Sequence, residues 1–209
     1  MTEALVIVFV KNKKIGTVKT RLAKTIGHIG AFEVYSELLK ITEKVTRELA
    51  HDKHIYFSNS TEDSQWSNTF KTIQVGDNLG EKMYNAFNDG FNLGYKRIVL
   101  IGSDLPTIST SIIENAIHAL ESNDTVFGPA EDGGYYLIGL NRPIKSIFEN
   151  KPWSKTNLLA TTLNELKESG LSFHLLKTLN DIDTYEDLIA SEFYKTNIKL
   201  QEKIQQLND

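Results

Sequence analysis

Short apolar runs alternate along the chain with longer segments in which apolar residues recur every three or four positions. The first run, Ala4 to Val10, is apolar throughout, and a loop from Lys11 to Val18 follows it. The next segment has apolar residues at helical spacing, at Val34, Leu38, Ile41, Val45 and Leu49. This alternation predicts mostly parallel strands that are buried on both faces and connected by helices.

The same patterns define the remaining elements. The later predicted strands are His54 to Ser58, Thr72 to Val75, Ile98 to Ile101, Thr125 to Gly128 and Ser172 to Lys177. The later predicted helices are Leu79 to Leu93, Ser109 to Leu120, Pro143 to Glu149, Lys155 to Ser169 and Thr184 to Phe193. The pair Gly133-Gly134 separates two strand-like runs, which predicts a hairpin after Gly128. We expect one α/β domain over residues 1–193, a three-layer sandwich, and a polar tail or surface helix over 194–209.

Composition narrows the possible classes. The chain has 209 residues, of which 40% are hydrophobic, and this suits one sizeable core. A net charge of -4 argues against a nucleic-acid-binding surface, and the absence of cysteine excludes disulfides, thiolate zinc sites and cysteine nucleophiles. No run approaches the roughly 18 apolar residues of a membrane span, and no charged leader with a cleavage site is present. We expect a cytoplasmic protein without a membrane partner; the oligomeric state stays open.

The stretch RIVLIGSDLP, from Arg97 to Pro106, places one carboxylate just after a buried strand. Ligands of open α/β sheets bind in the crevice at the carboxyl ends of the strands, where Asp104 is expected. Pro106 stiffens the turn because it fixes its own φ and restricts the residue before it. Asp104 is therefore a candidate ligand residue, although an aspartate there also suits a helix cap.

Five cations lie within eleven residues after the first strand, in KNKKIGTVKTRLA. They surround Gly16 at the entry to a helix, where backbone N–H groups and the helix dipole favour an anion; they are Lys11, Lys13, Lys14, Lys19 and Arg21. The spacing of a P-loop is absent, so we reject that motif. The cluster predicts a phosphate site, and the alternative is a solvated basic surface.

A second candidate is QVGDNLGEKM, which precedes a predicted helix. Gly76 and Gly80 bracket Asp77 and Asn78 in a tight turn that would let the backbone approach a nucleotide base or ribose. A cap for the helix, provided by Asp77 or Asn78, is an equally good explanation, and the two roles are compatible.

Two further stretches carry acidic residues. In GPAEDGGYYLIGL, two acids and two glycines make a poor strand and favour a functional turn at Asp132, Gly133 and Gly134. In TLNDIDTYEDL, Asp181 and Asp183 are two residues apart and would share a face if the chain is extended. Mg²⁺ or Mn²⁺ often takes only one or two protein carboxylates and completes its shell with substrate phosphates, so Asp104 and one of this pair would suffice.

The ordered set KTRLA, LGEKM, GSDLP, GPAEDGGYYLIGL, PWS and DIDT resembles the transferase 1 family associated with radical SAM and selenium-domain genes. This family is a branch of the nucleotide-diphospho-sugar transferase superfamily with the Rossmann-like GT-A fold. Its members are described as glycosyltransferases, including a proposed role in arsenosugar synthesis. Nearer structural kin are similar to guanylyltransferases that act on small phosphorylated acids. The resemblance covers about residues 4 to 190.

The resemblance implies specific roles. Asp104 matches the metal-binding aspartate, Asp183 the late acidic position that often supplies a second ligand, and Lys19 with Arg21 the phosphate-handling residues. Asp132, Gly133 and Gly134 match the segment that lines the acceptor side. Many glycosyltransferases of this fold carry Asp-x-Asp where this chain has Gly102-Ser103-Asp104, and a lone aspartate resembles nucleotidyltransferases.

These observations lead to one predicted activity and two alternatives. We expect a glycosyltransferase that uses a nucleotide-diphospho-sugar, Mg²⁺ or Mn²⁺ and a small-molecule acceptor, with Asp132, Lys19 and Arg21 as catalytic residues. The metal ligands would be Asp104 and Asp183, with Asp181 as the alternative to Asp183. The predicted substrate-binding residues are Lys11, Lys19, Arg21, Gly76, Asp77, Asn78, Gly80, Ser103, Gly133, Gly134 and Trp153. The alternatives are a nucleotidyltransferase that joins an NMP unit from an NTP to a phosphorylated metabolite, and a nucleotide-binding module without catalysis.

Overall fold

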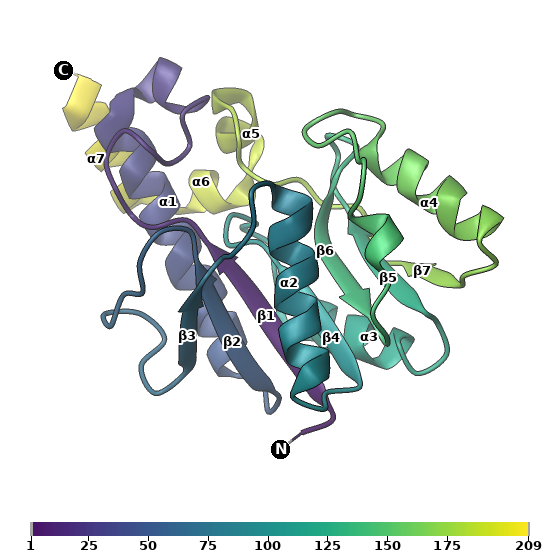
Figure 1. Cartoon of the computed structure of the whole chain (residues 1–209). Helices are drawn as coiled ribbons and strands as arrows, with labels where there is room; N and C mark the ends of the chain where they lie inside the picture. The colour runs from purple at the N-terminus through teal and green to yellow at the C-terminus, as the bar shows by residue number, and fades with distance from the viewer. Residues whose placement is uncertain (1, 209) are drawn as a thin grey trace.

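A seven-stranded sheet forms the centre of the molecule (Figure 1). The computed structural model describes residues 2–208 and gives the strand order β3-β2-β1-β4-β6-β5-β7, in which β6 is antiparallel to both of its neighbours. The strands are β1 (Ala4–Val10), β2 (Asp52–Phe57), β3 (Phe70–Ile73), β4 (Arg97–Ile101), β5 (Thr125–Pro129), β6 (Tyr135–Leu140) and β7 (Phe173–Leu175). The predicted α/β class with a mostly parallel sheet is confirmed, and so is the hairpin after Gly128.

Helices cover both faces of this sheet. On one face lie α1 (Ala23–Arg47) and α3 (Thr110–Ala119); on the other lie α2 (Leu79–Asn92), the 3-10 turn η1 (Lys145–Ile147) and α4 (Leu158–Glu168). Successive residues of a strand point to opposite faces, so β1 serves both layers. Val6 and Val8 pack toward α1 and α3, whereas Leu5 and Ile7 pack toward α2. All four are fully buried, which explains why the run is apolar throughout.

The end of the chain packs against its beginning. Three short helices follow the sheet: α5 (Tyr185–Ala190), α6 (Glu192–Thr196) and α7 (Ile198–Asn208). Leu200 and Ile204 of α7 are buried in one cluster with Val34 and Leu38 of α1. The polar tail expected from the sequence thus contains a helix whose apolar side is covered. None of the helices within residues 2–208 is long and apolar enough to cross a membrane.

Several boundaries differ from the prediction for local reasons. The helix expected over Pro143 to Glu149 is a single 3-10 turn. Asn150, three residues after this turn, has a φ of 54°, a left-handed conformation in which a right-handed helix cannot continue. The helix expected over Thr184 to Phe193 is two helices, because Ser191 is extended and its hydroxyl caps the second one. The helix expected over Ser109 to Leu120 is capped by Ser109, whose hydroxyl accepts a hydrogen bond from the N–H of Ile112.

A buried hydrogen bond ties the loop between β2 and β3 to the first helix. Trp66, which is buried and has a φ of 43°, donates from its indole N–H to the hydroxyl of Thr46 at 2.8 Å. Thr46 is itself fully buried on α1, so water cannot replace this bond. The contact fixes the loop that returns the chain to the sheet edge at β3.

The substitution Thr46→Val tests this anchor. It is expected to lower the free energy of unfolding by about 1 to 3 kcal/mol, because it keeps the side-chain shape but leaves the buried indole N–H without an acceptor. The control Thr42→Val lies one turn earlier and is equally buried, and its hydroxyl donates to the Leu38 carbonyl of its own helix. Urea unfolding followed by circular dichroism measures both, and equal losses would contradict the role of the Trp66 bond.

Candidate active site

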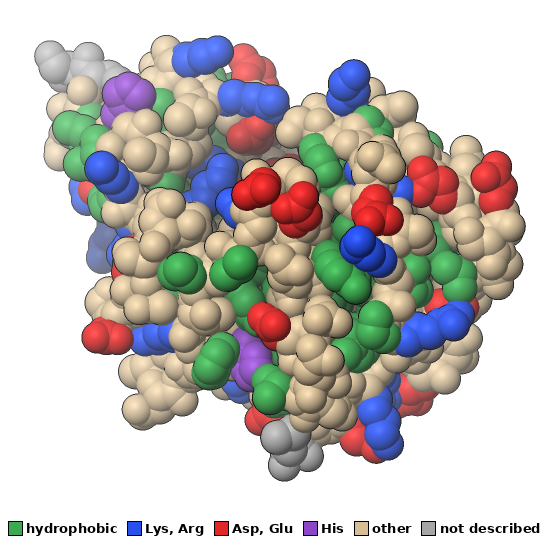
Figure 2. All heavy atoms as spheres, in the orientation of Figure 1, with side chains coloured by type: hydrophobic (Ala, Val, Ile, Leu, Met, Phe, Trp, Pro, Cys, Tyr) green, Lys and Arg blue, Asp and Glu red, His purple; other side chains and the backbone are tan. Residues whose placement is uncertain are grey.

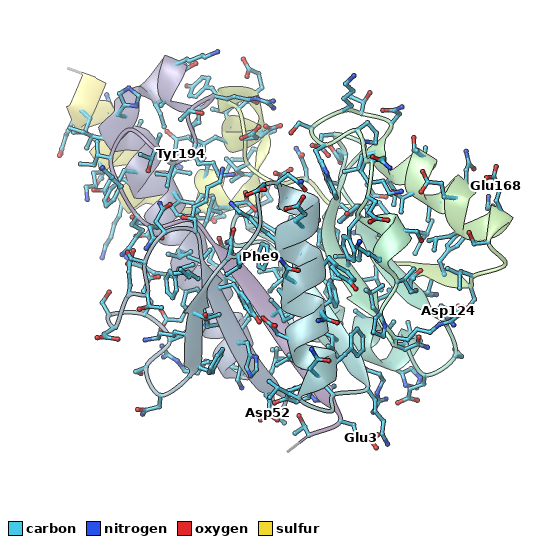
Figure 3. The ribbon with its side chains drawn as sticks, in the orientation of Figure 1. Glu3, Phe9, Asp52, Asp124, Glu168 and Tyr194 are labelled. Carbon is cyan, nitrogen blue, oxygen red and sulfur yellow. The ribbon has the colours of Figure 1, made fainter. Side chains whose placement is uncertain are left out.

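Three carboxylates from separate segments line one cavity at the carboxyl end of β4. Asp104 follows β4, Asp132 lies in the turn between β5 and β6, and Asp181 precedes α5. They share a cavity of about 280 Å³, whose wall includes the apolar side chain of Phe9 near the end of β1 (Figure 3). Figure 2 shows acidic and basic side chains gathered around a hollow at this upper edge of the molecule. The predicted position of Asp104 in the crevice is what the structure shows.

Asp104 is held in an ion pair with Lys19. The ammonium Nζ of Lys19 donates to Oδ2 of Asp104 at 2.9 Å, and the Lys19 side chain is only 5% exposed. Loss of hydration raises the pKa of Asp104, but the charge and hydrogen bond of Lys19 and the charge of Lys11 outweigh it, so the pKa lies below its ordinary value. Asp104 is therefore an anion at neutral pH, paired with a buried cation.

Asp181 lines the same cavity, but its pKa is shifted in the opposite direction. Loss of hydration, together with the negative charges of Asp104 and Asp132, raises its pKa to about 6, although the charge of Lys19 acts in the opposite direction. This carboxylate therefore lies where negative charge accumulates.

Asp183, two residues later, is directed elsewhere. Its Oδ2 accepts a hydrogen bond from Nη1 of Arg21 at 2.8 Å, and both side chains are exposed. Asp183 does not line the cavity, whereas Asp181 does. The sequence-based preference for Asp183 as the second metal ligand is thus not what the geometry favours. The chain around this pair belongs to no strand, so residues two apart do not share a face.

The basic loop after β1 reaches the edge of the cavity where Lys19 contacts Asp104. Lys19 and Arg21 pair with Asp104 and Asp183, as described above, and Lys11 is exposed beside them. The loop is anchored by Tyr35, whose hydroxyl donates to the Lys11 carbonyl oxygen at 2.9 Å and accepts from the Lys11 N–H at 3.0 Å. Tyr35 lies on the buried side of α1, and the sequence pattern did not single it out.

Ser103 does not contact the cavity. It is buried, and its hydroxyl lies 3.0 Å from the Tyr35 hydroxyl. In this structure the Ser103 hydroxyl links the β4 turn to α1, so the geometry does not favour the substrate-binding role, which stays a prediction of the sequence. Ser103 and Tyr35 together join the turn that carries Asp104 to the loop that carries Lys11.

The turn before α2 is mainly a helix cap. Asn78 accepts a hydrogen bond from the Glu81 N–H, and the Glu81 carboxylate accepts from the Asp77 N–H and the Asn78 amide. Asn78 and Gly80 also line a second hollow of about 750 Å³, whereas Gly76 and Asp77 do not. Of the two explanations offered by the sequence, the cap is confirmed.

Glycines set the shape of the acidic turn. Gly133 has a φ of 87°, and a Cβ there would lie 1.8 Å from the carbonyl oxygen of Thr156, so a side chain is excluded. Gly134 donates its N–H to Oδ1 of Asp132 at 2.8 Å, which leaves that exposed carboxylate fixed at the cavity edge. The close approach to Thr156 also places this turn beside Trp153, which lines both hollows.

The carboxylates at the cavity suit a hard cation that takes most of its ligands from groups other than the protein. Within residues 2–208 no group of three or more histidine or acidic side chains is arranged to hold a metal ion. Asp104 and Asp181 nevertheless influence each other's charge across one cavity, and two carboxylates are the usual protein share of a Mg²⁺ site completed by phosphates. The donor set thus suits Mg²⁺ or Mn²⁺ only together with an anionic ligand.

Comparisons with known proteins agree with this fold. The family model described as "Uncharacterized protein conserved in bacteria (DUF2064)" matches residues 39–155, more than half of the chain. No curated protein matches the chain.

Several solved structures are similar to the chain. The chain is similar to a protein of Desulfovibrio desulfuricans G20, described provisionally as a nucleotide-diphospho-sugar transferase, with 27% identity, 99% coverage of both chains and a TM-score of 0.87. It is also similar to the inositol-1-phosphate CTP transferase of T. maritima (11% identity, 98% of this chain and 96% of that chain, TM-score 0.54). A third likeness is to Rv0371c of Mycobacterium tuberculosis H37Rv in complex with manganese (12% identity, 90% and 97%, TM-score 0.55). The last two show the fold alone. The predicted GT-A-like fold is confirmed.

The raised pKa of Asp181 predicts that the stability of the folded protein depends on pH. The folded protein holds a proton on this carboxyl up to about pH 6, whereas an unfolded aspartate loses it near its ordinary pKa of 3.8. Unfolding therefore releases a proton between these values, so this group makes the protein less stable as pH rises through them, and the full penalty remains above pH 6.

Asp181→Asn removes this penalty. The variant is expected to have a higher unfolding temperature than the wild type at pH 7.5 and a much smaller difference at pH 4, in metal-free buffer. Asp183→Asn is the matched control, since Asp183 pairs with the exposed Arg21 and should gain no stability at pH 7.5. Differential scanning calorimetry at both pH values measures this, and a pH-independent gain for Asp181→Asn would refute the explanation.

Proposed function

The chain belongs to the DUF2064 family of proteins conserved in bacteria, and we propose that it is a metal-dependent transferase that acts on a nucleotide-activated donor. The observation that carries the proposal is the ion pair of Lys19 with Asp104, beside that of Arg21 with Asp183, at a cavity that Asp104 and Asp181 line. Cations and carboxylates that alternate in this way offer partners for both phosphate oxygens and a divalent ion. The D. desulfuricans relative supports the same class of reaction.

The proposed roles follow from where each side chain lies. Lys19, Arg21 and Lys11 bind the diphosphate and stabilise the charge that develops on it as the donor bond breaks. Asp104 and Asp181 would hold Mg²⁺ or Mn²⁺, which supplies further neutralisation of the phosphates. Asp132, exposed at the cavity edge and held by Gly134, orients an acceptor hydroxyl and takes up its proton.

Glycosyl transfer is our first choice of reaction. The acceptor oxygen attacks the anomeric carbon, the bond from this carbon to the diphosphate breaks, and the nucleoside diphosphate leaves. Among the described residues that line the 280 Å³ cavity, three are aspartates and Lys155 is the one cation. Such a lining suits a neutral hydroxyl acceptor better than a phosphorylated one, which would need basic partners.

Nucleotidyl transfer is the second candidate. Gly102 lies at the cavity in the position where many sugar transferases of this fold would carry the first aspartate of Asp-x-Asp. The likeness to the T. maritima CTP transferase also suits this reaction, in which a phosphate oxygen of the acceptor attacks the α-phosphorus and pyrophosphate leaves. The narrower resemblance to radical-SAM-associated transferases and the cytoplasmic location stay predictions of the sequence.

The metal assignment predicts how nucleotides bind. GDP and UDP should bind at least about tenfold more tightly with Mn²⁺ than with EDTA, because Asp104 and Asp181 would hold an ion that neutralises the phosphates. Asp104→Asn and Asp181→Asn should each remove most of this enhancement, whereas Asp183→Asn should keep it. Titration calorimetry on the four proteins tests the assignment. Loss of the enhancement in Asp183→Asn but not in Asp181→Asn would restore the preference drawn from sequence.

The two reactions are separated by their products. A panel of nucleotide sugars and NTPs is first screened for thermal protection, since a ligand at about 100 times its dissociation constant adds roughly 2.7 kcal/mol of stability. For a glycosyltransferase, a nucleotide sugar protects best and the protein slowly releases NDP in a metal-dependent way. Protection by an NTP alone, with pyrophosphate released when a phosphorylated acid is added, would favour nucleotidyl transfer. Binding without turnover of any donor would indicate a non-catalytic module.

A further inference from the structure

We propose that Lys19 closes the cation position at Asp104 and that a nucleoside diphosphate opens it, so that the diphosphate must bind before or together with the metal. This inference rests on the proposed function and specifies the order in which its ligands bind. The starting observation is the 2.9 Å contact between Nζ of Lys19 and Oδ2 of Asp104. An ammonium in that place neutralises the carboxylate that a divalent ion would need.

The backbone aims Lys19 at this position. Lys19 has a φ of 47°, in the left-handed region that non-glycine residues seldom adopt, and its carbonyl oxygen accepts a hydrogen bond from the N–H of Ala23 at 2.9 Å. Strained conformations of this kind persist only where the surroundings enforce them, and they concentrate at functional sites. Its side chain is 5% exposed, so the ammonium has left most of its water to reach Asp104.

A divalent ion without a nucleotide would gain few ligands by displacing Lys19 from Asp104. No cluster of three or more acidic or histidine side chains suited to a metal occurs in the part of the chain that the structure describes. An ion that displaced Lys19 would gain Asp104 and Asp181 while leaving a buried ammonium without its partner, which is costly. Mg²⁺ also gives up its water reluctantly.

A diphosphate makes the displacement more favourable because it offers new partners to both Lys19 and the divalent ion. Its oxygens would accept hydrogen bonds from Lys19, in place of the Asp104 carboxylate, and would supply the ligands that the ion lacks. Lys11, whose charge already acts on Asp104, lies on the same side. Each ligand then strengthens the binding of the other by the same factor, as linkage requires.

The Arg21 pair contributes less to this closure. Arg21 and Asp183 are 64% and 40% exposed, so water and salt weaken their attraction, and Asp183 lies outside the cavity. The closed state therefore depends mainly on Lys19.

The experiment titrates metal-free protein with Mn²⁺ alone and again in the presence of saturating GDP or UDP. Wild type should bind Mn²⁺ weakly without the nucleotide and much more tightly with it. Lys19→Met, which keeps the alkyl chain and removes the charge, should bind Mn²⁺ alone at least about tenfold more tightly than wild type, and the effect of the nucleotide should shrink. Lys11→Met is the matched control, because Lys11 acts on Asp104 by charge without bonding to it, and its effect should be smaller.

Unchanged Mn²⁺ affinity in Lys19→Met, or equal gains in Lys19→Met and Lys11→Met, would overturn the inference. If Lys19→Met does not fold, a measurement on wild type replaces it: GDP without metal should shift the ¹³C resonance of the Asp104 carboxyl, and no shift would overturn the inference. Metal-enhanced nucleotide binding in wild type together with an unaffected Lys19→Met would refute only the closure. Absence of Mn²⁺ binding in every protein, with and without nucleotide, would refute the metal part of the proposed function as well.

Discussion

The antiparallel insertion of β6 between β4 and β5 is the constraint on which the site depends. β5 runs parallel to β1 and β4 through the sheet, so the turn from β5 to β6 lies at the same edge as the carboxyl ends of those strands. Asp132 is thereby brought to the cavity that Asp104 lines, although the two are far apart in sequence. The opposite edge, where Glu3 and Asp52 lie in Figure 3, carries ion pairs and hydrogen bonds between neighbouring segments.

Two of the carboxylates at the upper edge are paired with cations, and Asp181 is under the opposite electrostatic influence. Lys19 neutralises Asp104, and Arg21 neutralises Asp183, whereas the pKa of Asp181 is raised by burial and by its acidic neighbours. A protein selected for stability alone would not keep a third carboxylate in that cavity. In the proposed function, a cation that arrives with the substrate would relieve this repulsion, and the positive φ of Lys19 is a second cost at the same site.

Regular elements were predictable from sequence because their causes are local. An uninterrupted apolar run such as Ala4 to Val10 has few alternatives to a strand buried on both faces, and Ser109 carries the chemistry of a helix cap within three residues. Sequence reasoning is less informative where tertiary contacts decide. Ser103 looked available beside Asp104, but its hydroxyl is bonded to Tyr35, 68 positions earlier in the chain.

The choice between Asp181 and Asp183 shows the same limit at the site itself. Two carboxylates two positions apart share a face only in a strand, and this segment lies outside every strand and helix. Arg21 bonds to Asp183, whereas Asp181 is partly buried in the cavity with Asp104 and Asp132. Residue identity alone could indicate that an acid from this segment joins the site. Which acid it is follows from where the basic loop places its guanidinium, so the basic loop and the acidic segment must be interpreted together.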